Sequence, residues 1–398
     1  MSEFTKFIAN LNRNRYTRLF HRIKNEKIPC AFFIPEVTFQ EQISVFEQLK
    51  NLGFNVQYFF TLDENLKNPV LEVPVMHVKK IHEIAPKPKY VIATSSNSDF
   101  FVNRFKDAGM EIFNIFAGNE NTNEIFDFYM DHLNEIEEVD SLLDEDSRQV
   151  FRGYISAKVS NRFTDFIFDP MPQYLLHGYL PKPNDIVICA GACDGATAAM
   201  FVDLKCRVIA FEMDQYNYEL SKKLAAEKNF VLENFGLGSY EHEINYAHFP
   251  DNLGASRFVQ AGRIVQAGGF KTAEVGNVLK AKIISIDQYV REKNLESVDF
   301  IQLDTEGAEL EILKGAVVTM SRFKPTLAVS AYHKPEDIFT LAQFIKSIRS
   351  DYKFAFRHYG TEPASTIFAN AQYIQNFLKE NDLPMIMYSD CENVLYAR

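Results

Sequence analysis

The sequence predicts an α/β protein with two layered parts, a small one near the N-terminus and a larger one after residue 180. Three observations support this fold class. Short apolar runs alternate with amphipathic stretches of helical length, a pattern typical of parallel sheets. A strand, a glycine turn, a helix start and a second strand follow one another between residues 185 and 212. The chain of 398 residues is also long enough for about two to three domains.

Four regions are expected along the chain. Residues 1–27 have the pattern of a basic amphipathic helix, and residues 28–117 that of a small α/β domain without a recognisable catalytic set. Residues 118–180 are expected to form a helical connector and residues 181–398 the larger domain. The basic helix can lie on an anionic membrane, but docking on its own domain, or on a second subunit of a homo-oligomer, is the favoured interpretation.

The composition describes a soluble, acidic globular protein. A formal net charge of −11 argues against a nucleic-acid enzyme, which normally carries a strongly basic face. The five cysteines are few and odd in number, which favours reduced thiols over disulfides or a metal site. The N-terminus has no apolar signal core and no stretch is long enough to cross a bilayer, so we expect a cytoplasmic protein.

Two glycines shape the turn after the first strand of the larger domain. Residues 186–188 are a short apolar run of the buried-strand type, and Gly191 and Gly195 follow them. A turn without side chains lets a ligand approach the backbone. Glu212 closes the next strand with a carboxylate that can accept hydrogen bonds from a ribose diol. This unit therefore predicts a site for an adenosine-containing cofactor.

The spacing of the turn discriminates between adenosine cofactors. A nicotinamide dinucleotide favours Gly-x-Gly-x-x-Gly because its pyrophosphate lies on the amides of a helix N-terminus. Here the spacing is Gly191-x-x-x-Gly195, with Asp194 where a diphosphate would approach. That carboxylate opposes a dianion but tolerates a zwitterionic methionine group. We therefore expect S-adenosylmethionine rather than NAD, while a plain strand-to-helix turn with glycines is the alternative.

A second constellation of acidic residues follows another apolar strand. Asp304 stands at the carboxyl end of the strand over residues 300–303, and Glu306 and Glu309 come shortly after it. Ligands of doubly wound sheets bind outside the carboxyl ends of the strands, so Asp304 and Glu306 should face the same cleft as the glycine turn. Complementarity to a helix N-terminus is the alternative for Glu306 and Glu309, but explains Asp304 less well.

A histidine and two further strands complete the predicted domain. One strand ends just before His333, in the same half of the sheet as the acidic constellation, so a functional role competes with that of an ordinary core histidine. Residues 352–359 and 393–398 supply two more strands, with a helix near 372–379 between them. Five glycines among polar residues at 240–282 predict a mobile insertion near the cofactor cleft.

From about residue 140 to 398 the sequence resembles the FkbM-type S-adenosylmethionine-dependent methyltransferases. Each matching piece is short, but their order and spacing over some 250 residues make the resemblance specific. The pieces are residues 146–148, 173–174, 191–197, 210–212, 299–309, 314–315, 324–325, 332–337, 357–359 and 392–397. The N-terminal α/β domain lies outside the resemblance.

The resemblance implies both a fold and an activity. The expected fold is a Rossmann-like class I methyltransferase sandwich with a mostly parallel seven-stranded sheet that an antiparallel hairpin closes. The expected activity is O-methylation with S-adenosylmethionine as the methyl donor. The expected acceptor is a hydroxyl of a sugar or glycan, such as a surface polysaccharide or a glycosylated metabolite precursor.

Carried onto this chain, the resemblance gives the candidate residues roles. His333 first and Asp304 second are the candidates for the base that activates the acceptor hydroxyl, and Glu306, Arg357 and His358 are candidates for binding the acceptor. A metal held by Asp304, Glu306 and His333 is an alternative that we do not favour. The residues expected to bind the cofactor are Tyr174, Gly191, Ala192, Cys193, Asp194, Thr197, Glu212, Met213 and Asp304.

One position departs from the family pattern. The family usually has an acid at the end of the first strand, where this chain has Cys189. The acid helps to hold the amino group of the cofactor, and a neutral thiol cannot replace its charge. Weaker cofactor affinity, or compensation by Asp194 or Asp304, follows as a hypothesis.

Two other functional classes stay open at this point. A nicotinamide-dependent sugar-modifying oxidoreductase would also use Glu212 on ribose, but it would need a Tyr-x-x-x-Lys pair on a suitable helix, and we find no convincing one. A non-catalytic scaffold of glycan biosynthesis with a degenerate cofactor fold is the second class, and Cys189 favours it.

Overall fold

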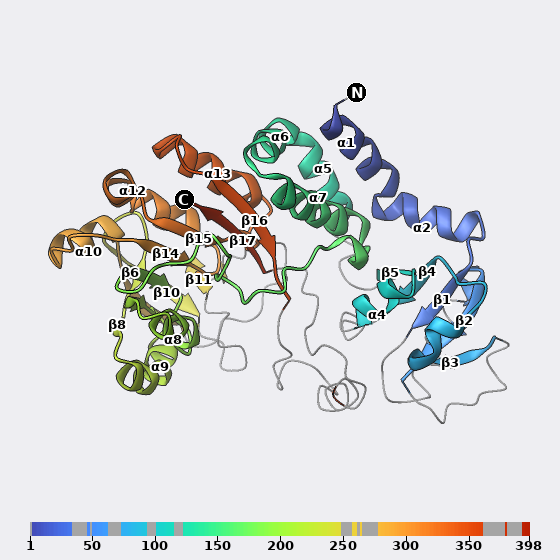
Figure 1. Cartoon of the computed structure of the whole chain (residues 1–398), viewed down its shortest axis with the longest axis horizontal. Helices are drawn as coiled ribbons and strands as arrows, with labels where there is room; N and C mark the ends of the chain where they lie inside the picture. Colours follow the sequence, from blue (N-terminus) through green and yellow to red (C-terminus); the bar gives the residue numbers. More distant parts are fainter. Residues whose placement is uncertain are drawn as a thin grey trace. The chain divides into compact units, whose positions relative to one another are not determined.

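The computed structural model describes residues 2–33, 46–47, 50–62, 73–93, 101–114, 122–247, 257–260, 263–264, 278–360, 379 and 392–398. The chain divides into two compact units, and each contains a largely parallel sheet (Figure 1). Unit 1 comprises Met1–Glu137, Arg148–Asp169 and His358–Asp390. Unit 2 comprises Glu138–Ser147, Pro170–Arg357 and Cys391–Arg398.

Unit 1 holds a five-stranded sheet with the order β3-β2-β1-β4-β5, and all its strand pairs are parallel. The central strands β1 and β4 are buried at every residue, as expected for apolar strands covered on both faces. The strands are β1 (Cys30–Phe33), β2 (Val56–Thr61), β3 (Val75–His77), β4 (Tyr90–Ala93) and β5 (Glu111–Asn114). The shorter helices are η1 (Val78–Glu83), α4 (Val102–Asp107) and η3 (Phe163–Asp165).

The single basic helix predicted at residues 1–27 is in fact two helices, α1 (Glu3–Asn14) and α2 (Tyr16–Asn25). Arg15 separates them because its ψ of 147° is extended rather than helical. The apolar face of α2 packs into the core of unit 1, where Leu19 and Ile23 join the buried residues of the sheet. The helix therefore docks on its own domain, which is the interpretation that the sequence favours.

Three helices follow the sheet of unit 1 in the region predicted to be a helical connector. They are α5 (Thr122–Asp131), α6 (Leu133–Leu142) and α7 (Glu145–Ser160). The boundary between the two units falls within both α6 and α7, so these helices contribute residues to each unit.

Unit 2 contains the predicted seven-stranded sheet, with the order β16-β17-β15-β14-β6-β7-β8. Its central pairs are parallel, whereas β17 runs antiparallel to β15 and confirms the expected reversal near the C-terminus. The strands are β6 (Ile186–Ala190), β7 (Arg207–Phe211), β8 (Val231–Glu233), β14 (Phe300–Leu303), β15 (Thr326–Ser330), β16 (Phe354–His358) and β17 (Asn393–Ala397). The predicted Rossmann-like class is thus confirmed.

Two groups of helices accompany this sheet, one on each side in Figure 1. In the first group α8 contacts α9, β6 and β7, and in the second α13 contacts α11 and α12. Asp214 caps α9, because its carboxylate accepts hydrogen bonds from the amides of Tyr216 and Asn217. The helices are α8 (Ala196–Asp203), α9 (Gln215–Lys228), α10 (Ile286–Glu292), α11 (Glu309–Lys314), α12 (Val317–Phe323) and α13 (Asp337–Ile348).

The predicted insertion at 240–282 is partly a regular sheet. A second five-stranded sheet of unit 2 has the order β12-β11-β10-β13-β9, in which β10 pairs antiparallel with β13 over six residues of each strand. Its strands are β9 (Gly236–Leu237), β10 (His242–Ala247), β11 (Arg257–Gln260), β12 (Arg263–Ile264) and β13 (Val278–Ile284). The rest of the insertion and the helix predicted near 372–379, apart from residue 379, lie outside the described residues.

Within the described part of the chain, no helix combines the length and the apolar character needed to cross a membrane.

Candidate active site

A cleft of about 370 Å³ lies in unit 2 beside the carboxyl ends of β6, β7 and β14. This is the edge at which parallel sheets bind ligands, and the volume lies within the range of about 300–1,000 Å³ that is usual for ligand pockets. Ala190, Phe211, Asn217, Leu237 and Ile283 contribute to its wall. The predicted site residues that line it are Gly191, Cys193, Thr197, Glu212, Met213, Asp304 and Glu306.

The glycine turn forms one wall of the cleft, and its first position, Gly191, has no room for a side chain. Gly191 has a φ of +80°, and a Cβ atom at this position would lie 1.8 Å from the backbone oxygen of Asp304. The turn is held by the amides of Gly191 and Ala192, which both donate to the backbone oxygen of Phe211. Gly195, with a φ of +86°, then starts helix α8. The backbone of the turn is consequently exposed to the cleft without a side chain in between.

Glu212 follows β7 and ties the turn to the next helix. Its Oε2 accepts a hydrogen bond of 2.7 Å from the amide of Cys193, and its Oε1 accepts one of 2.8 Å from the amide of Asp214. Burial raises the pKa of Glu212 to about 7, although these backbone hydrogen bonds act in the opposite direction. Each carboxylate oxygen still has a lone pair that can accept a hydrogen bond from a ligand.

Asp304 lies between two tyrosines at the end of β14. The hydroxyl of Tyr174 donates to its Oδ2 over 2.6 Å, and the hydroxyl of Tyr332 donates to its Oδ1 over 3.2 Å. Tyr174 is 3% exposed and also hydrogen-bonds Ser330, so it supports Asp304 from behind and does not line the cleft. Burial raises the pKa of Asp304, while His333 and the two tyrosines oppose this effect.

His333 stands behind Asp304 and not in the wall of the cleft. Its Nδ1 lies 3.0 Å from Oε1 of Glu309, its Nε2 lies 3.4 Å from Oδ1 of Asp304, and its side chain is 6% exposed. Burial alone would lower the pKa of His333, but Glu309, Asp304 and Glu306 outweigh it and raise the pKa to about 9. At neutral pH the ring is therefore an imidazolium between two carboxylates.

Glu309 is a site residue whose role the sequence underestimates. Its side chain is 1% exposed, and its Oε1 accepts hydrogen bonds from the amide and the hydroxyl of Thr305. Burial would raise its pKa, but His333 and these donors bring the pKa below the ordinary value. Because Glu309 is the first residue of α11, the sequence pattern alone is equally compatible with a surface helix start.

Asp304, Glu309 and His333 each offer a potential metal-ligand atom, and these atoms lie within 4.8 Å of one another. This group differs from the metal alternative considered from the sequence, because it contains Glu309 in place of Glu306. Both ring nitrogens of His333 face a carboxylate, which is the arrangement of an ion-paired imidazolium. A metal ligand would instead be neutral and would direct one nitrogen at the ion.

Glu392 and Tyr332 also line the cleft, although the sequence does not single them out as site residues. Glu392 accepts a hydrogen bond of 2.8 Å from Gln173. Its pKa is raised to about 7, mainly by burial and then by the charge of Asp304. The sequence could have indicated both residues through their neighbours. Tyr332 directly precedes the predicted site residue His333, and Glu392 directly precedes the last predicted strand.

The lining of the cleft is acidic. Glu212, Asp304, Glu306 and Glu392 contribute carboxyl groups, and no lysine or arginine lines it within the described residues. A region of one sign of charge in a confined site attracts ligands of the opposite sign. The cleft is therefore suited to a cationic or hydroxyl-rich ligand and unsuited to a diphosphate.

Besides Tyr174 and His333, four more predicted site residues do not line the cleft. Ala192 is buried in the turn, and Asp194 is exposed and accepts a hydrogen bond from the amide of Ala196. Arg357 donates instead to the hydroxyl of Ser147 over 2.7 Å. His358 is 1% exposed and stacks on Phe166 at a ring distance of 4.5 Å. The placement of Arg357 and His358 gives no support to their expected role in binding the acceptor.

Cys189 is also absent from the cleft wall. It lies in β6 in register with Gln302 of β14, and its thiol donates to the side-chain oxygen of Gln302 over 2.8 Å. Burial raises the pKa of this thiol, and the charges of Asp304 and Glu212 raise it further. The side chain at 189 is thus a neutral part of the sheet interior.

Comparison with known proteins finds a family match within the larger domain. Residues 190–375 match the family described as the methyltransferase FkbM domain. No curated protein matches the sequence. Among solved structures, the methyltransferase FkbM of Methylobacillus flagellatus KT is similar, with a TM-score of 0.57 and 16% identity over 99% of this chain and 98% of that chain. The shared fold therefore includes unit 1, which the sequence resemblance leaves out.

Two further solved structures match with lower TM-scores. A precorrin 8w decarboxylase from Methanobacterium thermoautotrophicum has a TM-score of 0.30 and 12% identity, over 55% of this chain and 82% of that chain. An rRNA methylase from Streptococcus thermophilus has a TM-score of 0.28 and 13% identity, over 55% of this chain and 88% of that chain.

Proposed function

Because residues 190–375 match the methyltransferase FkbM domain, we propose that the protein transfers a methyl group from S-adenosylmethionine to a hydroxyl of a sugar or glycan. The observation that carries the proposal is the acidic cleft at the glycine turn, which no lysine or arginine lines within the described residues. A cofactor with a sulfonium and an ammonium group suits such a cleft, whereas the diphosphate of NAD would be repelled.

The residues of the cleft fit this cofactor. Gly191 lines the cleft without a side chain, so the methionine part could lie against its backbone. Glu212, which lines the cleft at the end of β7, would accept hydrogen bonds from the ribose. Thr197 and Met213 supply the remaining wall on this side.

We propose that Asp304 receives the proton of the acceptor hydroxyl. When bound, the cofactor would supply an activated methyl group, so the chain has to orient the hydroxyl and exclude water. Asp304 lines the cleft, and Tyr174 and Tyr332 fix its carboxylate. A raised pKa brings a carboxylate closer to the acidity that proton transfer at neutral pH requires.

His333 then has a positioning role. With a pKa of about 9 it is protonated at neutral pH and is poorly suited to accept a proton, although sequence reasoning ranks it first as the base. Its Nε2 faces Asp304, so it would hold that carboxylate in place and balance its charge. This arrangement needs no metal ion, and we expect turnover to survive treatment with EDTA.

Glu306 and Glu392 support the proposed acceptor class. Both line the cleft near Asp304, and carboxylates are strong acceptors for the several hydroxyl groups of a sugar ring. An acidic wall also argues against acceptors that carry phosphate close to the reacting hydroxyl.

Thermal unfolding with added ligands tests the cofactor assignment. S-adenosylmethionine and S-adenosylhomocysteine should each raise the unfolding temperature, and NAD should not. Glu212→Gln should reduce the shift, while Glu227→Gln, on the exposed part of α9, should leave it unchanged. A shift with NAD alone would favour the oxidoreductase alternative, and no shift with any of the three would favour the scaffold. Transfer of a labelled methyl group to a panel of glycans then tests the acceptor class.

A further inference from the structure

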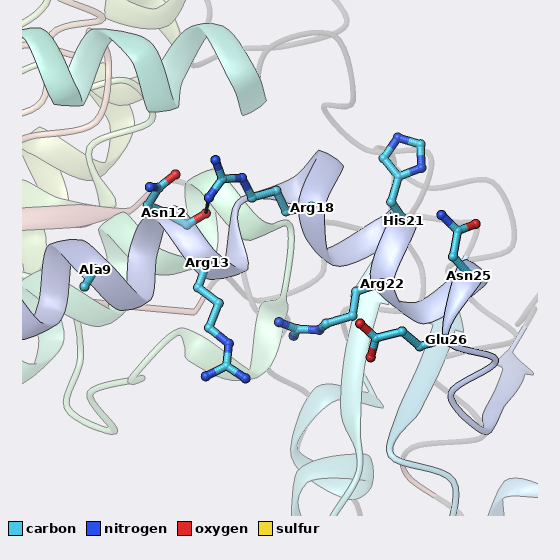
Figure 2. Close-up of a pocket in the computed structure, with 8 residues that line it drawn as sticks. All are labelled: Ala9, Asn12, Arg13, Arg18, His21, Arg22, Asn25 and Glu26. Atoms are coloured by element: carbon cyan, nitrogen blue, oxygen red, sulfur yellow. Dashed lines mark hydrogen bonds between the residues drawn. The ribbon is translucent and has the colours of Figure 1, made fainter.

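A second hollow lies on the two N-terminal helices of unit 1, at the junction of α1 and α2. Its volume is about 620 Å³, and Arg13, Arg18, His21 and Arg22 are among the residues that line it (Figure 2). We call it the arginine hollow. It belongs to a different unit from the cleft at the glycine turn, and nothing in the proposed methyl transfer uses it.

The fold places these side chains outward because the opposite face of the helices is buried. Tyr16, Leu19 and Ile23 of α2 pack into the core of unit 1. Residues at the other helical positions, including Arg13, Arg18 and His21, are therefore exposed. The break between the helices at Arg15 bends the chain, and the hollow lies beside this bend.

The arginines of the hollow are not neutralised by carboxylates. Arg18 donates to the backbone oxygen of Asn12 over 3.3 Å, and Arg22 donates to the side-chain oxygen of Asn14 over 3.2 Å. Both acceptors are neutral. Within the part of the chain that the structure describes, neither arginine forms an ion pair, and the same is true of Arg13.

Positive charge is concentrated in the N-terminal helices, although the protein as a whole is negatively charged. Residues 1–27 carry seven lysines and arginines against two glutamates, whereas the chain as a whole has a net charge of −11. Glu26 is the acidic residue of the hollow, and Figure 2 shows it beside Arg22. Arg13 and Arg18 remain on the side of the hollow away from it. Such a concentration of positive charge attracts a multiply charged anion.

We propose that the arginine hollow binds a phosphate-bearing ligand. A guanidinium group offers a planar pair of donors that matches two phosphate oxygens. The hollow has three guanidinium groups and one carboxylate, that of Glu26, so positive charge is left over for an anionic ligand. The residues described at 2–27 expose no large hydrophobic side chain, so the contact is with a phosphate group and not with acyl chains. The phosphate can belong to a soluble compound or to a lipid headgroup. The inference does not depend on the proposed methyl transfer.

Calorimetry with sodium pyrophosphate as the probe tests the soluble source, and sedimentation with vesicles tests the lipid source. Vesicles of phosphatidylglycerol are compared with vesicles of phosphatidylcholine, which carry no net charge. The full chain should bind pyrophosphate or the anionic vesicles, and the binding should weaken as salt is added. Binding to pyrophosphate identifies a soluble ligand, and binding to the anionic vesicles alone identifies a headgroup.

A pair of matched variants distinguishes a site from diffuse charge. Arg13→Gln with Arg18→Gln removes two positive charges from the hollow and should weaken binding about 10- to 100-fold. Lys6→Gln with Lys24→Gln removes two positive charges from the same helices outside the hollow and should change binding less than about twofold. Equal weakening by the two pairs, or no binding of either probe to the unmodified chain, would overturn the proposal. Because Arg13, Arg18 and Lys6 are exposed, both variants should unfold at the temperature of the unmodified protein.

Discussion

The Nδ1 atom of His333 lies 3.0 Å from a carboxylate oxygen of Glu309, in a part of unit 2 where both side chains are almost fully buried. A buried charge is costly unless a partner of opposite sign and further hydrogen bonds compensate it. Glu309 has both, since it faces His333 and accepts two hydrogen bonds from Thr305. The pair therefore fixes the protonation state of the ring that lies next to Asp304.

Removing the charge of Glu309 should release this constraint. We expect Glu309→Gln to lower the pKa of His333 from about 9 and to reduce the free energy of unfolding by about 3–5 kcal/mol, because a buried ion pair loses one partner. Urea unfolding gives the free energy, and an NMR titration of labelled histidine gives the pKa. The control Glu311→Gln, half-exposed and paired with Lys314, should cost no more than about 1 kcal/mol. An unchanged histidine pKa would contradict the assignment.

The same pair predicts a dependence of stability on pH. A histidine whose pKa is about 9 in the folded state and about 6.5 in the unfolded state binds its proton more tightly when folded. Its contribution to stability is complete below pH 6.5 and is lost as the pH rises to about 9. The difference in unfolding free energy between the wild type and Glu309→Gln should therefore narrow over this interval, by roughly 3 kcal/mol at most. A constant difference from pH 6 to 9.5 would show that His333 does not titrate there.

Asp304 is the residue whose loss should affect turnover most directly. We expect Asp304→Asn to lower kcat about 10²- to 10⁴-fold, the usual contribution of a positioned base, while the fold is retained. Asp203→Asn is the control, since that carboxylate is on the surface of unit 2 and pairs with Lys228. Methyl transfer under saturating S-adenosylmethionine measures the effect. Full activity of Asp304→Asn would remove Asp304 from the chemistry.

The glycine turn and its flanking strands could be predicted from the sequence because their signals are local. A fully apolar strand, glycines at fixed places and a carboxylate after the next strand specify the turn without knowledge of distant residues. The sheet that contains β10 and β13 could not be predicted in this way. Its two long strands are separated by some 30 residues, and their pairing depends on contacts across that distance.

Site residues at strand ends are hard to predict from sequence, because the pattern does not show which face of the sheet meets the cleft. Successive side chains in a strand point to opposite faces, so a motif identifies the strand end but not which of its residues reaches the cleft. Cys189 and Ala190 illustrate this, because only Ala190 lines the cleft. At His358 the ring is buried against Phe166. Glu309 shows the converse, since a residue at a helix start is buried behind the site.

Gly191 offers a test of how closely the turn approaches Asp304. Gly191→Ala should cost about 1–2 kcal/mol for its positive φ and about 1–3 kcal/mol more for the clash with the backbone oxygen of Asp304. Gly178→Ala is a matched control, because Gly178 has a φ of +87° but its nearest neighbour would be 3.9 Å away. Urea unfolding of both variants separates the cost of the positive φ, which both variants have, from the cost of the clash, which only Gly191→Ala has. Equal losses would mean that the turn has room for a side chain.

Cys189 provides the last test, because the family pattern and the structure give opposite expectations for it. If the side chain at 189 reached the cofactor, Cys189→Asp would supply a missing acid and raise the affinity for S-adenosylhomocysteine. In the structure the thiol instead donates to Gln302 inside the sheet, and the charges of Asp304 and Glu212 already act on it. A carboxylate there would have no positive partner among its described neighbours.

We therefore expect Cys189→Asp to lower the free energy of unfolding by several kcal/mol and to leave ligand affinity no higher. Cys189→Ser is the matched variant, because its hydroxyl keeps a donor for Gln302 at nearly the same volume and should cost about 1 kcal/mol. Urea unfolding and calorimetry with S-adenosylhomocysteine measure the two quantities. A Cys189→Asp protein that is as stable as the wild type and binds more tightly would place residue 189 in contact with the ligand. The wall of the cleft would then have to include the strand end at 189 as well as the turn at Gly191.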